Sequence, residues 1–318
     1  MGVITGADPT SAPPPAKAIR WLPSWLQTVP ALRRFALASV IANVGIVVTG
    51  GAVRLTNSGL GCPTWPSCTD QSLTPTRAYA IHGVIEFTNR QLTFVLAVIA
   101  IATWVVAMAV RRERALATVA ALGIPAQAVL GGLTVLTHLN PWLVAAHFLL
   151  SMALIAVTFR LWWRVRDTPT ASLPDAPAVQ LLVWATVAVT AAVLVIGTVV
   201  TGSGPHAGDK AADGTVRRTG LQVSSMAQLH ADAVMVLIGL TVGLVAVLFA
   251  VRAAPTARRA GLLLLGAELA QGIVGYVQYF LRVPPLLVGL HMLGACLVWL
   301  AALNVAGRLP ERVRRTAG

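Results

Sequence analysis

Charged side chains are scarce in this 318-residue sequence, because Asp, Glu, Lys and Arg make up 11% of it and hydrophobic residues 56%. A soluble domain carries roughly 25% charged residues. So few charges cannot cover a water-facing surface, which excludes an ordinary soluble protein and predicts a surface that faces lipid. The net charge is +13, but the basic residues occur in short runs between long apolar stretches. That pattern indicates membrane topology and argues against a partner made of nucleic acid.

Eight apolar stretches are long enough to cross a bilayer as helices, which takes about 20 residues with every backbone group hydrogen-bonded inside the segment. They cover roughly residues 35–54, 84–109, 115–137, 142–163, 179–202, 228–251, 259–281 and 285–306. The sequence therefore predicts an all-α membrane protein with eight transmembrane helices in the lipid bilayer.

The basic residues are distributed unevenly between the two sides of this predicted bundle. Seventeen of the 24 Lys and Arg residues fall in segments that would share one side: Lys17, Arg20, Arg33, Arg34, Arg111, Arg112, Arg114, Arg160, Arg164, Arg166, Arg252, Arg258, Arg259, Arg308, Arg312, Arg314 and Arg315. Loops rich in Lys and Arg face the cytoplasm. Both termini are therefore expected to be cytoplasmic, in a multi-pass protein of the cell (plasma) membrane.

The second half of the sequence repeats landmarks of the first. The following pairs are all 144 residues apart: Gln127 and Gln271, Gly131 and Gly275, Pro141 and Pro285, and His147 and His291. A second match joins Gly51-Ala-Val53 to Gly197-Thr-Val199. Because each half has an even number of helices, the two copies should run parallel, related by an axis along the membrane normal. The fold class is therefore two pseudo-symmetric four-helix bundles.

This repeat divides the chain into five expected parts. Residues 1–34 form a disordered cytoplasmic tail and the approach to the membrane, and residues 35–164 form the N-terminal four-helix half. A cytoplasmic linker over 165–178 leads to the C-terminal half at 179–306. A basic cytoplasmic tail follows at 307–318.

Cysteine is also rare, with three residues in the chain. Cys62 and Cys68 lie in the first loop on the outer side, where an oxidising environment favours a disulfide. The alternative is a pair of free thiols. Cys296 lies inside the last helix and is expected to be a small packing residue.

Three histidines lie in predicted helices near the outer face, namely His147, His230 and His291. Polar side chains at such depth usually face the bundle interior and serve function. The alternative for each is a histidine hydrogen-bonded to a neighbouring carbonyl. Two imidazoles from facing helices can hold haem between them, and His230 and His291 occupy corresponding ends of their helices. Zinc is less well matched, because neither cysteine nor carboxylate accompanies this pair.

The first half breaks the pattern. Opposite His147, the second helix offers His82, Glu86 and Asn89, whose spacing places them on one helical face with Arg90 beyond. A carboxylate at the edge of a haem-sized cavity can take protons or stabilise positive charge. The alternative is a Glu86–Arg90 ion pair that only tethers the helix. A half with one histidine and a carboxylate suggests a reaction site, and a half with two histidines suggests an electron-transfer site.

Several motifs resemble the haem A synthase family. They are Gly51-Ala-Val-Arg54-Leu-Thr-Asn-Ser-Gly59-Leu-Gly-Cys62-Pro-Thr-Trp-Pro-Ser-Cys68, Glu86-Phe-Thr-Asn89-Arg90, Gly197-Thr-Val-Val-Thr-Gly-Ser-Gly-Pro-His206-Ala-Gly-Asp209, Leu229-His230-Ala-Asp232 and Gln271-Gly-Ile-Val-Gly275-Tyr-Val-Gln-Tyr279. The resemblance covers about residues 35–306. It implies an eight-helix protein in two halves, with a haem b cofactor on His230 and His291.

The resemblance also implies an activity. The N-terminal half would bind the substrate haem O with His147 as a ligand and Glu86 as the catalytic acid/base or charge stabiliser. The C8 methyl of haem O would be oxidised by successive hydroxylations to the formyl group of haem A, which cytochrome oxidase uses. The haem O synthase (a farnesyltransferase) and cytochrome oxidase assembly proteins would be partners. Family members with a cysteine pair in this loop are thought to use it in redox chemistry or haem transfer.

One position departs from the family. The family motif usually reads Glu-x-x-His-Arg, and this chain has Asn89 where the histidine is expected. Asparagine is a poor iron ligand. Either His147 alone holds the substrate haem, or His82 substitutes from two turns away, about 10 Å along the helix axis.

Two other functions compete with an enzyme. A di-haem b-type electron-transfer cytochrome would also use paired histidines, but it would not need a carboxylate on the ligand face of only one half. A transporter is suggested by the repeat alone. Transporter repeats often contain helices broken near the midplane, whereas the Gly/Pro-rich stretches here fall in loops and helix ends.

Overall fold

The computed structural model describes residues 22–75, 80–167, 173–209 and 217–310, and within them every long element is a helix. Eight of these helices are long and apolar enough to cross a membrane, which confirms the predicted fold class for the described residues. They are α1 (Val29–Leu55), α2 (Ala80–Val110), α3 (Arg114–Leu136), α4 (Pro141–Val165), α5 (Pro177–Ser203), α6 (Val223–Ala250), α7 (Pro255–Phe280) and α8 (Pro285–Ala306).

Most helix starts lie a few residues before the predicted spans, because caps and polar first turns belong to a helix but not to its apolar stretch. Helix α1 begins six residues earlier, where Thr28 Oγ1 accepts a hydrogen bond from the Ala31 amide at 3.3 Å. Residues 29–34, assigned to the tail, are therefore helical. The rest of the expected tail up to residue 21, the linker segment 168–172 and the C-terminal segment 311–318 lie outside the described residues.

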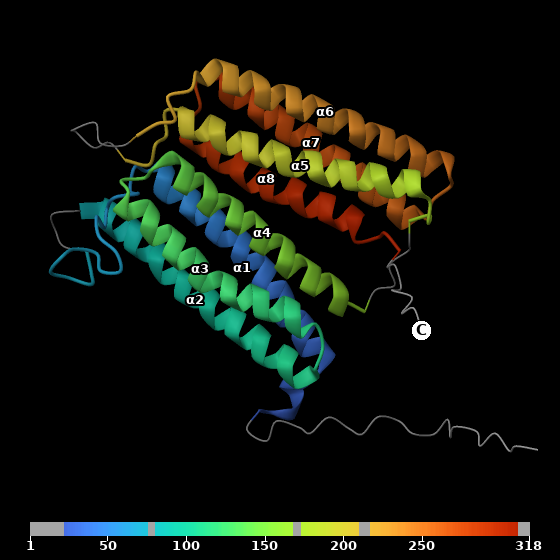
Figure 1. Ribbon diagram of the computed structural model, residues 1–318, viewed down its shortest axis with the longest axis horizontal. Coiled ribbons are helices and arrows are strands. Elements are labelled where there is room, and N and C mark those ends of the chain that lie inside the picture. Colours follow the sequence, from blue (N-terminus) through green and yellow to red (C-terminus); the bar gives the residue numbers. More distant parts are fainter. Residues whose placement is uncertain (1–21, 76–79, 168–172, 210–216, 311–318) are drawn as a thin grey trace, which may run out of the picture.

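The helices form two bundles of four, each closed into a ring by contacts between its neighbours (Figure 1). In the first ring α1 packs against α2 and α4, and in the second α5 packs against α6 and α8. The halves meet through α1 with α8 and through α4 with α5, and α4 also touches α8. Each contact of one half thus has a counterpart in the other, as the sequence repeat predicts.

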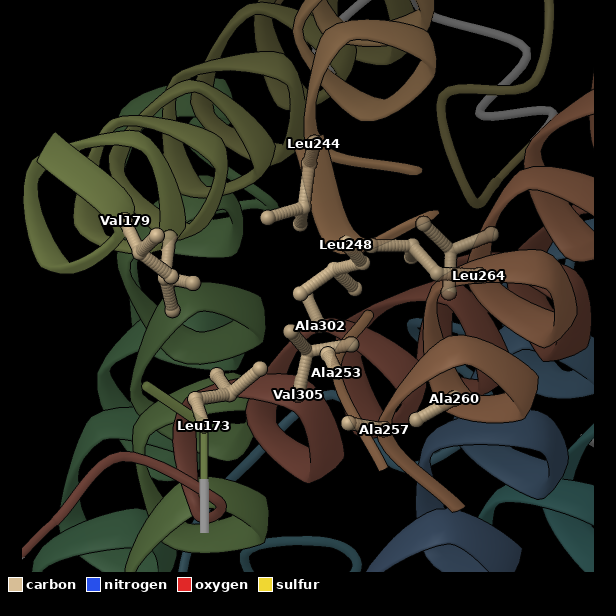
Figure 2. Packing of buried hydrophobic residues seen from close by; sticks show 12 residues of the cluster. Leu173, Val179, Leu244, Leu248, Ala253, Ala257, Ala260, Leu264, Ala302 and Val305 are labelled. Carbon is tan, nitrogen blue, oxygen red and sulfur yellow. The ribbon is translucent and has the colours of Figure 1, made fainter. Parts of the chain in front are cut away.

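Each half has its own apolar core. In the C-terminal half, Leu244, Leu248 and Leu264 are fully buried and pack towards Ala302 of α8 (Figure 2). A separate cluster containing Cys296 joins the two halves across α1, α4, α5 and α8. Cys296 is fully buried and free, which confirms its prediction as a packing residue.

Polar contacts tie the halves together at both ends of the bundle. At the loop end, where α1 meets α2 and α5 meets α6, Arg54 donates to the carbonyls of His206 at 2.7 Å and Thr201 at 3.0 Å. The opposite end carries the Arg-rich segments and is called the basic end below. There the Trp163 indole donates to the Gly307 carbonyl at 2.9 Å. The two bundles are therefore fixed against each other by hydrogen bonds as well as by packing.

Candidate functional site

Each of the repeated histidines sits in the same local environment. A Cβ atom placed on Gly131 would lie 3.0 Å from Cε1 of His147, and one on Gly275 would lie 3.3 Å from Cε1 of His291. The glycines of α3 and α7 therefore leave room for the imidazoles of α4 and α8. The preceding helix also supplies an amide, because Gln271 Nε2 donates to the His291 carbonyl at 2.6 Å. Gln127 makes the matching bond to the His147 carbonyl at 3.0 Å.

The second histidine of the C-terminal half also faces a glycine. A Cβ on Gly197 of α5 would lie 3.2 Å from Cε1 of His230 on α6. In the first half the nearest match is Gly50 of α1, whose added Cβ would lie 4.0 Å from Asn89 Nδ2. Gly51, which the sequence alignment pairs with Gly197, faces Met292 of α8 instead. By its contacts, Asn89 is thus the counterpart of His230, and the alignment is displaced by one residue at this glycine.

His230 and His291 lie side by side, with ring centroids 6.4 Å apart and ring planes at 65°. A metal–imidazole bond is about 2 Å long and half a ring adds about 1 Å, so two imidazoles on opposite sides of one iron would have centroids roughly 6 Å apart. The spacing fits that arrangement. The Nδ1 atoms of His147, His230 and His291 are buried without a hydrogen-bond partner among the described residues. Buried imidazoles left unpaired in this way are suited to a ligand.

No bare-metal site competes with this pair in the described part of the chain. Those residues contain no group of three or more His, Cys, Asp or Glu side chains that could hold a metal ion. A planar metal macrocycle, which brings its own nitrogen ligands, needs only axial donors from the protein. The donor set here matches haem better than a free cation.

The first half presents a different arrangement opposite His147. Asn89 is half-buried, and its Oδ1 has no hydrogen-bond partner among the described residues. His82 lies two turns closer to the loop end, where its side chain is exposed and its Nδ1 pairs with Ser58 Oγ at 3.0 Å. The structure therefore puts Asn89 in the position equivalent to a haem ligand and His82 against the loop between α1 and α2.

Glu86 is buried, with 5% of its surface exposed, and its carboxylate is held from two directions. Oε2 accepts a hydrogen bond from the Cys62 amide at 2.6 Å, and Oε1 accepts from Arg90 Nη2 at 2.6 Å and Nε at 3.1 Å. Arg90 also donates to the carbonyls of Cys62, Thr64 and Ser67. The ion pair that the sequence offered as an alternative is thus present, and it joins α2 to the loop.

Cys62 and Cys68 form a disulfide, as expected, and both are fully or almost fully buried. The loop that they close covers the loop end of the first half. The Trp65 ring packs against Gly132 of α3, leaving no room for a Cβ there, and Gly132 follows the glycine that faces His147. The disulfide, the Glu86–Arg90 pair and the histidine-bearing interior are therefore neighbouring parts of one structure.

The two halves differ in this polar equipment. With Asn89 and His230 as counterparts, Glu86 corresponds to Ala227 and Arg90 to Ala231. The C-terminal half thus has a second imidazole where the N-terminal half has an amide, and it has no counterpart of the ion pair. The pseudo-symmetric scaffold carries two different sites.

One buried carboxyl escaped the reading of the sequence. Glu268 in the middle of α7 is 3% exposed, and its Oε1 accepts a hydrogen bond from Thr241 Oγ1 of α6 at 2.8 Å. Its repeat counterpart, 144 residues earlier, is the buried Ile124. A single acidic residue within a long apolar stretch is the signal that points to such a group. The supporting roles of Gly131, Gly275 and their glutamines were likewise visible as a repeat but not as contacts with histidines.

The fold and the site define a class: a multi-pass membrane protein of two repeated four-helix bundles whose interior holds histidines in positions suited to haem. A family model described as cytochrome oxidase assembly protein (COX15-CtaA) matches residues 33–303. The chain belongs to this family.

Curated relatives point in the same direction. A protein named "Heme A synthase" from Lysinibacillus sphaericus is 32% identical over 135 residues, which is 41% of this chain and 43% of the relative. One of the same name from Geobacillus thermodenitrificans is 31% identical over 132 residues, or 40% of this chain and 41% of the relative. A third, from Listeria monocytogenes, is 32% identical over 127 residues, 38% of this chain and 41% of that protein. In each match the chain spans less than half of the relative's length.

Proposed function

We propose that this protein is a haem A synthase, which oxidises the C8 methyl of haem O by successive hydroxylations to the formyl group of haem A for cytochrome oxidase. The observation that carries the proposal is the asymmetry of the two halves. One half pairs two imidazoles, and the other opposes one imidazole with Asn89 and keeps a buried carboxylate, Glu86, at its loop end. The test is chromatography of haems extracted from membranes that contain this chain together with a source of haem O.

The C-terminal half would bind a resident haem b through His230 and His291. Their ring spacing and their unpaired Nδ1 atoms support this assignment. The chemistry that a haem held by two histidines supplies is one-electron transfer. In this half the protein's task is to fix both imidazoles, and Gly197, Gly275 and Gln271 do so by contact with the rings or with the backbone of the ligand helix.

The N-terminal half would bind the substrate haem O with His147 as the ligand. Asn89 leaves the opposite face without a strong iron donor, which supports a face open to reaction rather than a second electron-transfer site. His82 is less well placed to replace the missing histidine, because it is exposed and bonded to Ser58.

Glu86 would act on protons or on positive charge that develops at the substrate. Its Oε2 is held by the Cys62 amide and its Oε1 by Arg90, so the carboxylate is fixed in one orientation at the loop end of the bundle. A carboxylate positioned before the reaction starts needs no rearrangement to stabilise charge or take a proton. The loop closed by Cys62 and Cys68 covers this end and limits access of water to it.

The basic end would face the cytoplasm, as the distribution of Lys and Arg indicates. Both termini would then be cytoplasmic in the cell membrane, and the disulfide loop would lie on the oxidising side. A hydrophobic substrate made in the membrane suggests direct transfer from the haem O synthase, with cytochrome oxidase assembly proteins receiving the product.

A di-haem b-type cytochrome explains these observations less well. Such a protein would need two good axial ligands in each half, and Asn89 removes one of them. The retention of the Glu86–Arg90 pair in this half alone also has no purpose in simple electron transfer. A transporter is disfavoured because the eight helices in the described residues run without a break, although α3 contains Pro125.

Crowding the histidine pocket should release the resident haem. We expect Gly275→Leu to lose haem b, because even a Cβ at this position lies 3.3 Å from His291. Overpacking of this kind costs about 1–3 kcal/mol, which would weaken haem binding roughly tenfold to a hundredfold. The matched control is Gly272→Leu on the same helix, where an added Cβ meets nothing within 4 Å. Haem content measured on the purified variants checks this, and equal retention by both would contradict the pocket.

Removing the disulfide should harm catalysis more than haem b binding. Closing a loop of this length restricts the unfolded chain by about 2 kcal/mol, so Cys62→Ser/Cys68→Ser should loosen the backbone that holds the Glu86 carboxylate. We expect formation of haem A to fall while the absorption spectrum of the haem on His230 and His291 stays intact. Haem A formation at the wild-type rate would show that the loop does not position Glu86.

A further inference from the structure

The seam between the halves at the basic end carries two arginines on one tryptophan. The Trp163 ring of α4 is buried, and its Nε1 bond to Gly307 joins α4 to the end of α8. The guanidinium carbon of Arg166 lies 3.2 Å from the centre of this ring, and that of Arg308 lies 5.6 Å from it. Two positive groups, one from each half, are thus gathered around a single indole.

These two charges lack a negative partner in the described part of the chain. The nearby carboxylates there are engaged elsewhere, because Asp167 pairs with Arg33 and Glu113 with Arg164. The Nε atoms of Arg166 and Arg308 are buried without a hydrogen-bond acceptor. Burial lowers the pKa of both guanidinium groups, and the charge of Arg308 lowers the pKa of Arg166 further. The stacking on Trp163 compensates such repulsion only in part.

Both arginines lie at the membrane boundary. Helix α4 ends at Val165 and α8 at Ala306, so each guanidinium belongs to a residue within two positions of a helix end. Tryptophan is enriched at this depth, where lipid headgroups lie. Basic pockets between transmembrane helices on the cytoplasmic side are suited to anionic headgroups, and a guanidinium matches phosphate oxygens in geometry as well as charge.

We propose that Arg166 and Arg308, around Trp163, form a binding site for the phosphate of an anionic phospholipid that bridges the two halves. The phosphate accepts hydrogen bonds from both guanidinium groups and neutralises their repulsion, while its acyl chains lie along the lipid-facing surface of the bundle. The lipid thereby fastens α4 of one half to α8 of the other. This proposal rests on the seam alone and does not depend on the proposed haem chemistry.

Native mass spectrometry of the purified full chain in detergent tests the site. The probes are dioleoyl-phosphatidylglycerol, zwitterionic dioleoyl-phosphatidylcholine and inorganic phosphate at equal concentrations. We expect retained adducts with phosphatidylglycerol only. Each basic residue near an anionic lipid contributes about 1 kcal/mol, so Arg166→Gln/Arg308→Gln should bind this lipid roughly thirtyfold more weakly.

A matched variant separates the site from general attraction by positive charge. Arg111→Gln/Arg112→Gln removes two exposed arginines at the same end and should keep wild-type binding. Equal losses in both double variants, or unchanged binding in Arg166→Gln/Arg308→Gln, would overturn the site. Adducts with inorganic phosphate as abundant as those with the lipid would overturn the lipid as occupant. If the double variant does not fold, the single variants Arg166→Gln and Arg308→Gln should each bind about fivefold more weakly, and unchanged binding by both would refute the proposal.

Discussion

Replacing Glu86 by glutamine is expected to lower haem A formation at least about a hundredfold, the usual scale of a lost acid/base or charge-stabilising group. The haem on His230 and His291 should remain, because Glu86 lies in the other half of the protein. Glutamine has nearly the same shape and can still accept the hydrogen bond from the Cys62 amide. The change therefore removes the charge with little disturbance of the loop. Haem A content and the haem b spectrum, measured on the same membranes, give the two readouts.

A second variant distinguishes catalysis from tethering. Arg90→Gln breaks the ion pair and the bonds to the carbonyls of Cys62, Thr64 and Ser67, but it leaves the carboxylate in place. If Glu86 only tethers the loop, Arg90→Gln should be at least as harmful as Glu86→Gln. If Glu86 acts on the substrate, Glu86→Gln should be the more harmful of the two. Normal turnover in Glu86→Gln would refute the catalytic role outright.

Replacing His291 by alanine is expected to remove most of the resident haem. Haem held between two imidazoles depends on both, and alanine leaves a gap next to Gly275 without a donor. Loss of a metal-binding contact of this kind should reduce the bound haem at least roughly tenfold. Total haem b per protein, from purified samples expressed without a source of haem O, measures the effect.

Two histidine variants serve as controls for this result. His147→Ala should keep the resident haem and lose haem A formation, because it belongs to the other half. His138→Ala alters an exposed histidine just after α3 and should change neither property. Wild-type haem content in His291→Ala would contradict the pairing of His230 with His291.

Much of the fold could be predicted from the sequence because the bilayer imposes a simple rule. Each span needs an uninterrupted apolar stretch, so eight such stretches indicate eight helices. The repeated glutamine, glycine, proline and histidine residues indicated two related bundles, and the matching contacts of the halves agree with that. Helix starts were less predictable. Thr28 and Pro30 begin α1 through capping and backbone preference, which leave no trace in an average of hydrophobicity.

The site was only partly predictable. The residues that carry it were visible as motifs, but their contacts depend on how helices rotate and how the loop folds back. Spacing placed His82, Glu86 and Asn89 on one helical face, yet the loop takes up the first two and leaves Asn89 with an unpaired Oδ1. The ring distance between His230 and His291 and the buried Glu268–Thr241 pair each join helices distant in sequence. Such pairs follow from packing that spacing within one helix does not encode.

The measurement that tests the central claim most directly is haem extraction and chromatography from membranes that express this chain together with a source of haem O. The proposal predicts haem A, or its hydroxylated intermediate, together with haem b. Membranes carrying Glu86→Gln should show haem b and unchanged haem O. If well-folded wild-type protein with its redox partner present yields only haem b and unchanged haem O, the protein does not modify haem, and the synthase assignment is wrong.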